Sequence, residues 1–222
     1  MNNDITIPAL FDCRCAYLKS MFSSCKYPWE MLCGLKEYIA SLMLSGIPGF
    51  KMIDHMVLAG DGVSIHPSAV IMPYTIIGEG SEIRPGAFIR GSVVTGKNCV
   101  IGNSSEVKNS ILLDNVQIPH YNYVGDSVLG NYAHMGAGAV CSNLKSDGKN
   151  VVIHGDTPIK TSMRKIGGII ADGADIGCGC VLNPGTVIGK NTRVYPLTSL
   201  RGVYPPDSIV KSQNTVCEIT DR

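Results

Sequence analysis

The chain has no excess of charge of either sign and no long hydrophobic run. Its 19 Lys and Arg residues nearly balance 18 Asp and Glu residues, so the net charge is +1, and nothing favours binding to nucleic acid or an acidic membrane surface. No apolar stretch approaches the roughly 20 residues that span a bilayer. The start, Met1-Asn2-Asn3-Asp4, lacks the basic and apolar regions of a signal peptide. We therefore expect a cytoplasmic protein that binds neither nucleic acid nor membrane.

The chain also lacks the CxxC pairs of zinc and thiol-redox sites. It has nine cysteines, an odd number, and its closest pairs, Cys13-x-Cys15 and Cys178-x-Cys180, are separated by a single residue. Residues i and i+2 of a strand point the same way, so Cys178 and Cys180 can share a face. We expect free thiols in a reducing compartment and no metal, and a zinc site on these pairs is disfavoured.

What the chain does have is a six-residue repeat of aliphatic residues. The first run is Ile65, Ile71, Ile77, Ile83, Ile89, Thr95, Ile101 and Val107, and the second is Ile170, Ile176, Leu182, Ile188, Val194 and Leu200. A short fixed period with small or turn residues between the apolar positions is typical of a parallel β-helix, in which three hexapeptides close one triangular coil. An ordinary β-sandwich would show turn signals every 8–12 residues or so and no strict register.

The repeat divides the chain into three parts: a helical N-terminal segment at residues 1–55, the predicted β-helix at residues 56–205, and a short C-terminal tail at residues 206–222. The N-terminal segment is too small for a separate catalytic domain. We expect its apolar stripe to pack on the β-helix or on a neighbouring subunit.

Helical spacing of apolar residues predicts a helix over residues 28–44, with Pro28 in its first turn and Gly46 and Pro48 beyond its end. Asp12 is the candidate N-cap of a shorter helix over residues 13–22.

The repeat is interrupted in three places. It slips by one residue between Val107 and Leu112 and again between Val124 and Leu129, and it disappears over residues 143–168. Interruptions of a solenoid usually form the loops of its binding face. We therefore expect the functional site near these interruptions.

The segment between and after the slips carries the candidate chemistry. His120 lies in Pro119-His120-Tyr121-Asn122-Tyr123, and Gly136-Ala137-Gly138 follows, where a ligand can approach the backbone. Imidazole is the side chain best suited to accept a proton near pH 7. On the residues alone, His120 is either a general base or a structural histidine.

Residues 86–143 resemble, without gaps, the C-terminal domain of bacterial bifunctional N-acetylglucosamine-1-phosphate uridyltransferase/glucosamine-1-phosphate acetyltransferases. The His-x-x-Tyr-x-Gly-Asp motif from His120 to Asp126 and the Gly-Ala-Gly sequence carry the match. Tyr27-Pro28-Trp29-Glu30 resembles the N-terminus of short stand-alone relatives. The resemblance implies an all-β, left-handed parallel β-helix that forms homotrimers with sites between neighbouring subunits. It also implies an N-acyltransferase that uses acetyl-CoA and an amino-sugar phosphate.

The resemblance implies a role for each matching residue. His120 would be the general base that takes a proton from the sugar amine. The residues implied in substrate binding are Arg90, Lys108, Tyr123 and His134, and those implied at the CoA or its acetyl group are Ala137, Asn143 and Cys178. Arg90 and Lys108 are separated by three whole hexapeptides, so an uninterrupted coil stacks them toward one phosphate.

The sequence departs from this family in several ways. His134 stands where the family has an asparagine, Leu144 replaces an aromatic residue, and the loop over residues 143–168 is longer. No Gly-x-Gly-Thr-Arg nucleotide-binding loop occurs near the N-terminus, so no uridyltransferase half is expected. These departures put the identity of the sugar in doubt.

Two other functions stay open. The altered His134 and Leu144 suit a module that binds sugar phosphate or CoA without catalysis. A metal-dependent hydratase resembling γ-class carbonic anhydrases would need three converging imidazoles. His66, His120, His134 and His154 are numerous enough, but their spacing does not resemble that family's ligand pattern.

Overall fold

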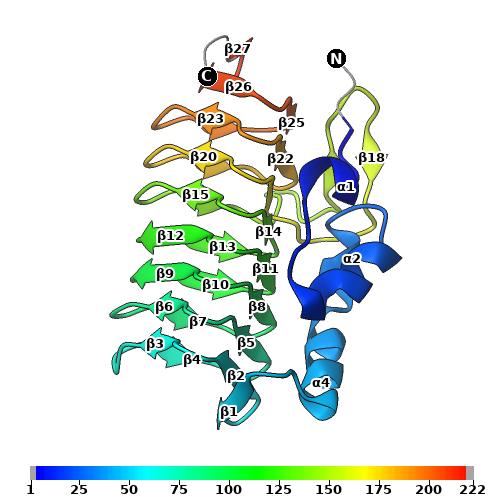
Figure 1. Ribbon diagram of the computed structural model, residues 1–222. Coiled ribbons are helices and arrows are strands. Elements are labelled where there is room, and N and C mark those ends of the chain that lie inside the picture. Colours follow the sequence, from blue (N-terminus) through cyan, green and yellow to red (C-terminus); the bar gives the residue numbers. More distant parts are fainter. Residues whose placement is uncertain (1–3, 219–222) are drawn as a thin grey trace.

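The computed structural model describes residues 4–218 and is a three-sided prism of short strands (Figure 1). We call its sides sheets A, B and C. Sheet A has the order β1 (Phe50–Asp54), β2 (Val57–Gly60), β5 (Thr75–Ile77), β8 (Val93–Thr95), β11 (Ser110–Leu112), β14 (Val128–Leu129), β19 (Gly168–Ile170), β22 (Thr186–Ile188) and β25 (Val203–Tyr204). Sheet B has the order β3 (Ser64–Ile65), β6 (Glu82–Ile83), β9 (Val100–Asn103), β12 (Gln117–His120), β15 (His134–Met135), β20 (Asp175–Ile176), β23 (Arg193–Val194), β26 (Ser208–Ser212) and β27 (Thr215–Glu218). Sheet C has the order β4 (Val70–Ile71), β7 (Phe88–Ile89), β10 (Glu106–Lys108), β13 (Tyr123–Gly125), β16 (Val140–Cys141), β21 (Val181–Leu182) and β24 (Ser199–Leu200).

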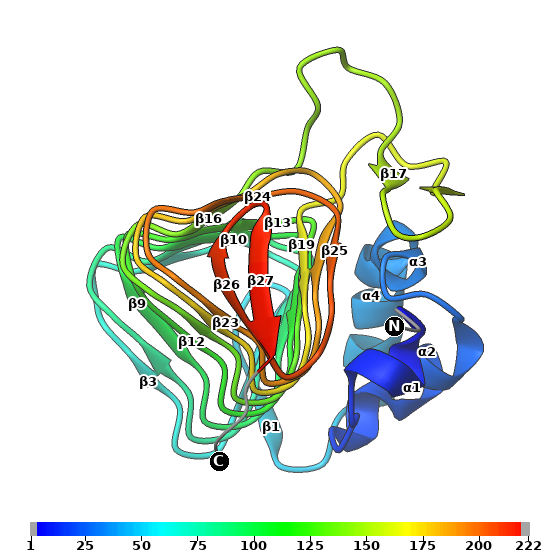
Figure 2. The same cartoon turned by 90° about the horizontal axis from the view of Figure 1, so that it is seen from above.

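The prism is a left-handed coil. The chain passes from sheet B to sheet C and then to sheet A, as β3, β4 and β5 do. Seen from its C-terminal end, it turns clockwise while it rises toward the viewer, which defines a left-handed helix (Figure 2). The predicted left-handed parallel β-helix of hexapeptide repeats is therefore confirmed.

The coils differ in length at one edge of the prism. Ile83 pairs with Ile101, three whole hexapeptides later, as the six-residue repeat predicts. Val107 pairs with Val124, which is one residue short of three hexapeptides. Both predicted slips fall between a strand of sheet C and the next strand of sheet A, so the edge between these sheets, the C–A edge, is shortened there. The segment over residues 143–168 leaves the prism at the same edge.

Residues of the six-residue repeat point into the prism and form its core. Ile77, Ile89, Ile101 and Val107 are among those with no exposed surface. Thr95, the one residue of the repeat that is neither Ile, Leu nor Val, is buried with them, and its hydroxyl accepts the backbone N–H of Gly78 at 2.8 Å. Thr95 is therefore tolerated because its polar atom has a partner.

Corners between the sheets use left-handed backbone conformations. Asn98, Asn109, Asn115 and Asn191 all have positive φ angles, which asparagine tolerates better than most residues. Gly102 is required for a steric reason, because a Cβ there would lie 1.7 Å from the carbonyl oxygen of Pro119. Successive coils approach too closely at that point for any side chain.

The N-terminal segment forms short helices, and the two predicted ones differ in detail. They are α1 (Ile7–Leu10), the 3₁₀ turn η1 (Ala16–Leu18), α2 (Lys19–Ser24), α3 (Glu30–Cys33) and α4 (Leu35–Ser45). The helix predicted over residues 28–44 is divided in two at Gly34. Asp12 is not an N-cap; its carboxylate pairs with Arg14 at 2.8 Å instead. No helix within residues 4–218 has the length and apolar character needed to cross a bilayer.

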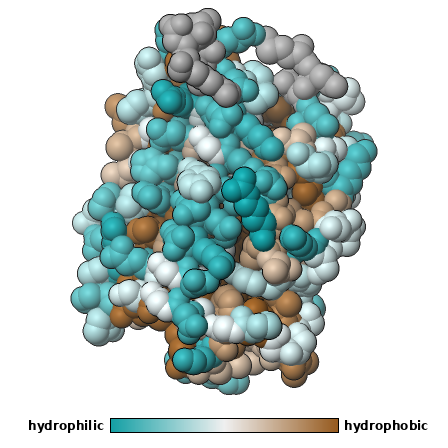
Figure 3. Space-filling model, viewed as in Figure 1, coloured by the Kyte–Doolittle hydropathy of each residue, from teal (hydrophilic) through white to brown (hydrophobic). Residues whose placement is uncertain are grey.

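The helices pack on the outer face of sheet A. Its strands carry a second aliphatic residue that points outward and is buried beneath the helices: Ile76, Val94, Ile111, Val128, Ile169 and Val187. Of the two packing partners left open by the sequence, the β-helix is confirmed (Figure 2). In the space-filling view the coils are mostly hydrophilic outside, and hydrophobic residues gather where the helices meet the prism (Figure 3).

The long segment is partly structured. It forms an antiparallel hairpin of β17 (Val152–Ile153) and β18 (Ile159–Lys160). Val151, Ile153 and Ile166 are fully buried in the same apolar cluster as the helices. Its first part extends away from the prism beside sheet C (Figure 2).

The predicted C-terminal tail, residues 206–222, is structured in its described part up to Glu218, although its residues after Val210 are exposed. Strands β26 and β27 form an antiparallel hairpin that closes the top of sheet B. Val210 is fully buried and continues the inner stack above Val194. The six-residue repeat does not reveal it, because the last coil, in which Arg193 pairs with Ile209, is shorter than three hexapeptides.

Candidate functional site

Sheet C presents two outward rows of side chains. Phe88, Glu106 and Tyr123 stack in the first row on successive coils. Arg90, Lys108 and Gly125 follow two residues later on the same strands and form the second row, because alternate residues of a strand face the same side. The structure thus brings Arg90 and Lys108 onto adjacent coils.

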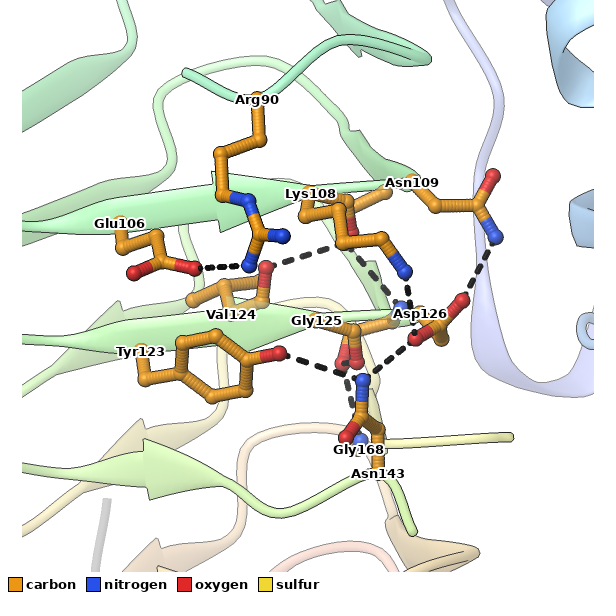
Figure 4. A network of polar contacts seen from close by, with 12 residues as sticks. Arg90, Glu106, Lys108, Asn109, Tyr123, Val124, Gly125, Asp126, Asn143 and Gly168 are labelled. Carbon is orange, nitrogen blue, oxygen red and sulfur yellow. Dashed lines mark hydrogen bonds and ion pairs between the residues drawn. The ribbon is translucent and has the colours of Figure 1, made fainter. Parts of the chain in front are cut away.

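Each of these two cations has a carboxylate partner. Arg90 Nη1 lies 2.7 Å from Glu106 Oε1, and this hydrogen bond raises the pKa of Arg90. Lys108 Nζ lies 3.6 Å from Asp126 Oδ2. Reasoning from the sequence assigned Glu106 and Asp126 no role, yet each forms an ion pair with one of the two cations, and the two pairs lie side by side on sheet C (Figure 4).

Tyr123 reaches toward Asn143 across a glycine. A Cβ at Gly125 would lie 2.5 Å from the Tyr123 hydroxyl and 2.8 Å from Asn143 Nδ2, so the missing side chain leaves room for the ring. Asn143 Nδ2 donates to the Tyr123 hydroxyl at 3.2 Å, which leaves the phenol proton free for another acceptor. Burial, with the charges of Asp126 and Glu106, raises the pKa of Tyr123, so the phenol stays protonated at neutral pH.

Three corner residues link the coils along the C–A edge. The Asp126 carboxylate accepts hydrogen bonds from Asn109 Nδ2 at 2.8 Å and from Asn143 Nδ2. Each neighbour in this stack is 17 residues from the next, which is the length of the shortened coil. This spacing is the sequence signal that would have found Asp126.

His120 lies on the edge between sheets B and C, at the end of β12. Its imidazole is exposed and has no hydrogen bond or ion pair with any residue in the described range 4–218. The Gly138 N–H donates to the His120 carbonyl at 3.0 Å, and the Gly179 N–H to the Ala137 carbonyl at 2.8 Å. His120, Ala137 and Cys178 therefore stack on three successive coils, about 4.8 Å apart.

His134 does not join the cluster on sheet C. It lies on sheet B, where its Nδ1 is 2.8 Å from Asp175 Oδ1. This hydrogen bond lowers the pKa of Asp175. Within one chain, the structure therefore separates His134 from the other implied substrate residues.

One cavity borders sheet C, and a larger one lies beside the helices. A polar cleft of about 480 Å³ separates sheet C from the start of the long segment; its lining includes Leu144, Lys145, His154 and Arg201. There Arg201 Nη2 is 3.3 Å from His154 Nε2. A larger cavity of about 620 Å³ between the helices and the coils contains none of the implied site residues.

Metal ligands do not gather in one chain. Among residues 4–218, no group of three or more His, Cys, Asp or Glu side chains is arranged to hold a metal ion. The four imidazoles considered for a zinc site thus do not converge within a protomer. All nine cysteines are free thiols.

Two family models match the chain. Residues 76–164 match the model described as the GMPPB C-terminal domain, and residues 60–91 match the bacterial transferase hexapeptide model of six repeats.

Curated relatives extend beyond the chain. The bifunctional protein GlmU of Methanococcus maripaludis strain S2 is 36% identical over 181 residues, which cover 80% of this chain and 44% of the relative. The bifunctional sugar-1-phosphate nucleotidylyltransferase/acetyltransferase of Sulfurisphaera tokodaii is 34% identical over 59% of this chain and 28% of its own length. The chain therefore spans less than half the length of these relatives.

Solved structures are similar at lower identity. UDP-N-acetylglucosamine acyltransferase from Campylobacter jejuni matches with a TM-score of 0.43 and 17% identity, over 69% of this chain and 74% of that one. A mutant of AntD, an N-acyltransferase from Bacillus cereus in complex with dTDP-4-amino-4,6-dideoxyglucose and coenzyme A, matches with a TM-score of 0.44 and 16% identity, over 80% and 93%.

Proposed function

We propose that this chain, a hexapeptide-repeat relative of the bifunctional GlmU proteins, transfers an acetyl group from acetyl-CoA to the amine of an amino-sugar phosphate similar to glucosamine-1-phosphate. One observation carries the proposal. Two cations and a phenol lie on the outer face of sheet C with the Asn143 amide beside them at the C–A edge, and the B–C edge of the same sheet carries His120 in line with Ala137 and Cys178.

The reaction needs a base. The unprotonated amine attacks the thioester carbonyl, a C–N bond forms, and the C–S bond breaks to release the CoA thiol. His120 takes the proton that the nitrogen loses, and the leaving sulfur acquires a proton. The imidazole of His120 is exposed, so an acceptor amine can reach it, and this supports the role.

The acceptor phosphate would bind to Arg90 and Lys108. Arginine supplies a planar donor fork and lysine a compact charge, which together suit a phosphate. Glu106 and Asp126 keep both cations extended on the sheet surface before the anion arrives. Tyr123 has a free phenol proton to donate to a sugar or phosphate oxygen.

Acetyl-CoA would lie along the edge that carries His120, Ala137 and Cys178. The polar cleft lies at the C–A edge, on the other side of sheet C, and a CoA that crosses the sheet would bring its phosphates to Lys145 and Arg201. We further propose a homotrimer in which sheet B of one protomer faces sheet C of the next, because His134 can join the acceptor site only across such a boundary. Sedimentation that shows a monomer would contradict the shared site.

The test is a CoA-release assay with acetyl-CoA and glucosamine-1-phosphate, read by chromatography because the protein has exposed thiols of its own. The wild type should turn over and His120→Ala should lose activity. His66→Ala is the matched control, since His66 is also exposed and bonds Ser68 at 2.8 Å in the lowest coil. Failure to turn over any of several amino-sugar phosphates would refute the proposal.

One observation favours a second candidate, a module that binds sugar phosphate or CoA without catalysis. The His120 side chain has no partner in the described residues to orient it, whereas catalytic histidines usually have one. This alternative requires binding of glucosamine-1-phosphate or CoA by calorimetry, no turnover, and little effect of His120→Ala on affinity.

A further inference from the structure

Asp126 is a buried carboxylate at the C–A edge of the prism. Only 6% of its side chain is exposed, and its backbone has a φ of 49°. Its backbone N–H donates to the Lys108 carbonyl at 2.9 Å, and its own carbonyl accepts the Gly167 N–H at 2.8 Å. Gly167 lies at the end of the long segment, so Asp126 joins that segment to the coil that carries Lys108.

The two oxygens of this carboxylate have different partners. Oδ1 accepts from Asn109 Nδ2 at 2.8 Å. Oδ2 accepts from Asn143 Nδ2 and lies 3.6 Å from Lys108 Nζ. Lys108 and Asn143 therefore converge on a single oxygen atom, from the coil below and the coil above (Figure 4).

This convergence fixes the orientation of the Asn143 amide. Its NH₂ group is shared between Asp126 and the Tyr123 hydroxyl, so its carbonyl oxygen points away from both. An amide carries donors on one side and an acceptor on the other. Without the carboxylate, either orientation of the amide would be available to Asn143.

Another Asn–Asp hydrogen bond links corners of successive coils elsewhere in the chain. Asn191 Nδ2 donates to Asp207 Oδ1 at 3.0 Å at the edge between sheets A and B. That contact is exposed and lies far from Lys108 in the coil. Asp126, by contrast, is buried, contacts Lys108 and is linked to the long segment.

We propose that Asp126 is a positioning residue of the acceptor site. Its carboxylate holds the Lys108 ammonium where the acceptor phosphate would bind, and it orients the Asn143 amide, which the family resemblance places at the CoA or its acetyl group. Its backbone carbonyl fastens the long segment beside them. The inference rests on the proposed function, because that function supplies the phosphate for Lys108 and the acetyl-CoA for Asn143.

The test compares Asp126→Asn with the same change at another corner, Asp207→Asn. Asparagine keeps the shape and tolerates the positive φ, but it has no charge and turns an NH₂ group toward donors. We expect kcat/KM for glucosamine-1-phosphate to fall about tenfold or more, mainly through KM, as for a weakened charge-assisted contact. Asp207→Asn should leave both constants within about twofold.

Combining substitutions tests whether Asp126 acts through Lys108 and Asn143. In a Lys108→Met, Asn143→Ala background, adding Asp126→Asn should change the remaining kcat/KM by less than about twofold, because the groups it positions are gone. A purely structural role predicts the same loss in both backgrounds. It also predicts a lower melting temperature with unchanged KM, and either result would overturn the inference.

One measurement does not depend on turnover. In ¹⁵N-labelled, ligand-free protein, the Asn143 side-chain amide protons should shift upfield in Asp126→Asn and stay in place in Asp207→Asn. An unmoved Asn143 signal overturns the positioning role. Wild-type protein without turnover would instead refute the proposed function, while this spectrum still decides the geometry.

Discussion

The substitution Gly125→Ala should lower the acetyl-transfer activity strongly and the stability of the fold only slightly. The new Cβ would lie 2.5 Å from the Tyr123 hydroxyl and 2.8 Å from Asn143 Nδ2. Ordinary contacts begin near 3.4 Å, so the phenol must move by roughly 1 Å. Both obstructing groups are the ends of flexible side chains, and the backbone of Gly125 does not have a positive φ.

These facts set the two magnitudes. The fold should lose less than about 1 kcal/mol, because the side chains can turn aside and alanine also restricts the unfolded chain. Activity should fall more, because a misplacement of about 1 Å in a site can reduce the rate about 100-fold. A 100-fold loss of kcat/KM corresponds to about 2.7 kcal/mol of transition-state stabilisation.

The assay is urea denaturation beside acetyl-transfer kinetics, with Gly102→Ala as the contrast. A Cβ at Gly102 would meet the Pro119 carbonyl oxygen at 1.7 Å, and backbone cannot turn aside. Gly102→Ala should therefore destabilise the fold by about 1–3 kcal/mol or more. If Gly125→Ala retains its kcat/KM, the positions of Tyr123 and Asn143 do not matter for the reaction, and the reasoning fails.

Three further predictions concern stability and thiol chemistry. Removing the helical segment up to Pro48 should expose the apolar outer row of sheet A, and should cause dye binding and aggregation in sedimentation experiments. At pH 8, Ellman's reagent should label the exposed thiols quickly, those of Cys33, Cys178 and Cys217. Cys99 should react only on unfolding, because burial raises its pKa to about 12. His134 lowers the pKa of Asp175, so their contact stabilises the fold above the ordinary carboxyl pKa and loses that effect as pH falls through the lowered one. His134→Ala should thus be less stable than wild type at neutral pH and match it in strong acid, as measured by urea denaturation.

The six-residue repeat was sufficient to predict the fold, because each coil must place one residue of each hexapeptide inside the prism. The sequence also contained a signal that the helices pack on sheet A. Ile76, Ile111 and Ile169 each precede an inward aliphatic residue, and such pairs recur on strands of sheet A. A strand buried on both faces needs both residues, so the pairs identify the covered side.

The candidate site was only partly predictable. Arg90 and Lys108 are separated by three whole hexapeptides, so the sequence was enough to place them on adjacent coils. Their carboxylate partners could not be predicted, because those contacts depend on side-chain conformations that spacing does not determine. Cys178 could be aligned with Ala137 only after the structure paired His134 with Asp175 across the long segment.

Departures from the repeat coincide at one edge for a physical reason. Each slip removes one residue between a strand of sheet C and the next strand of sheet A, at the corners of Asn109 and Asp126, and the long segment leaves that edge just after Asn143. A regular coil of three hexapeptides, such as the one from Leu182 to Leu200, has no such stack. Shortened corners bring side chains on successive coils into hydrogen-bonding distance, with one carboxylate in the middle. The regular coils supply rigidity, and the irregular edge fixes the position of Lys108 against that rigid support.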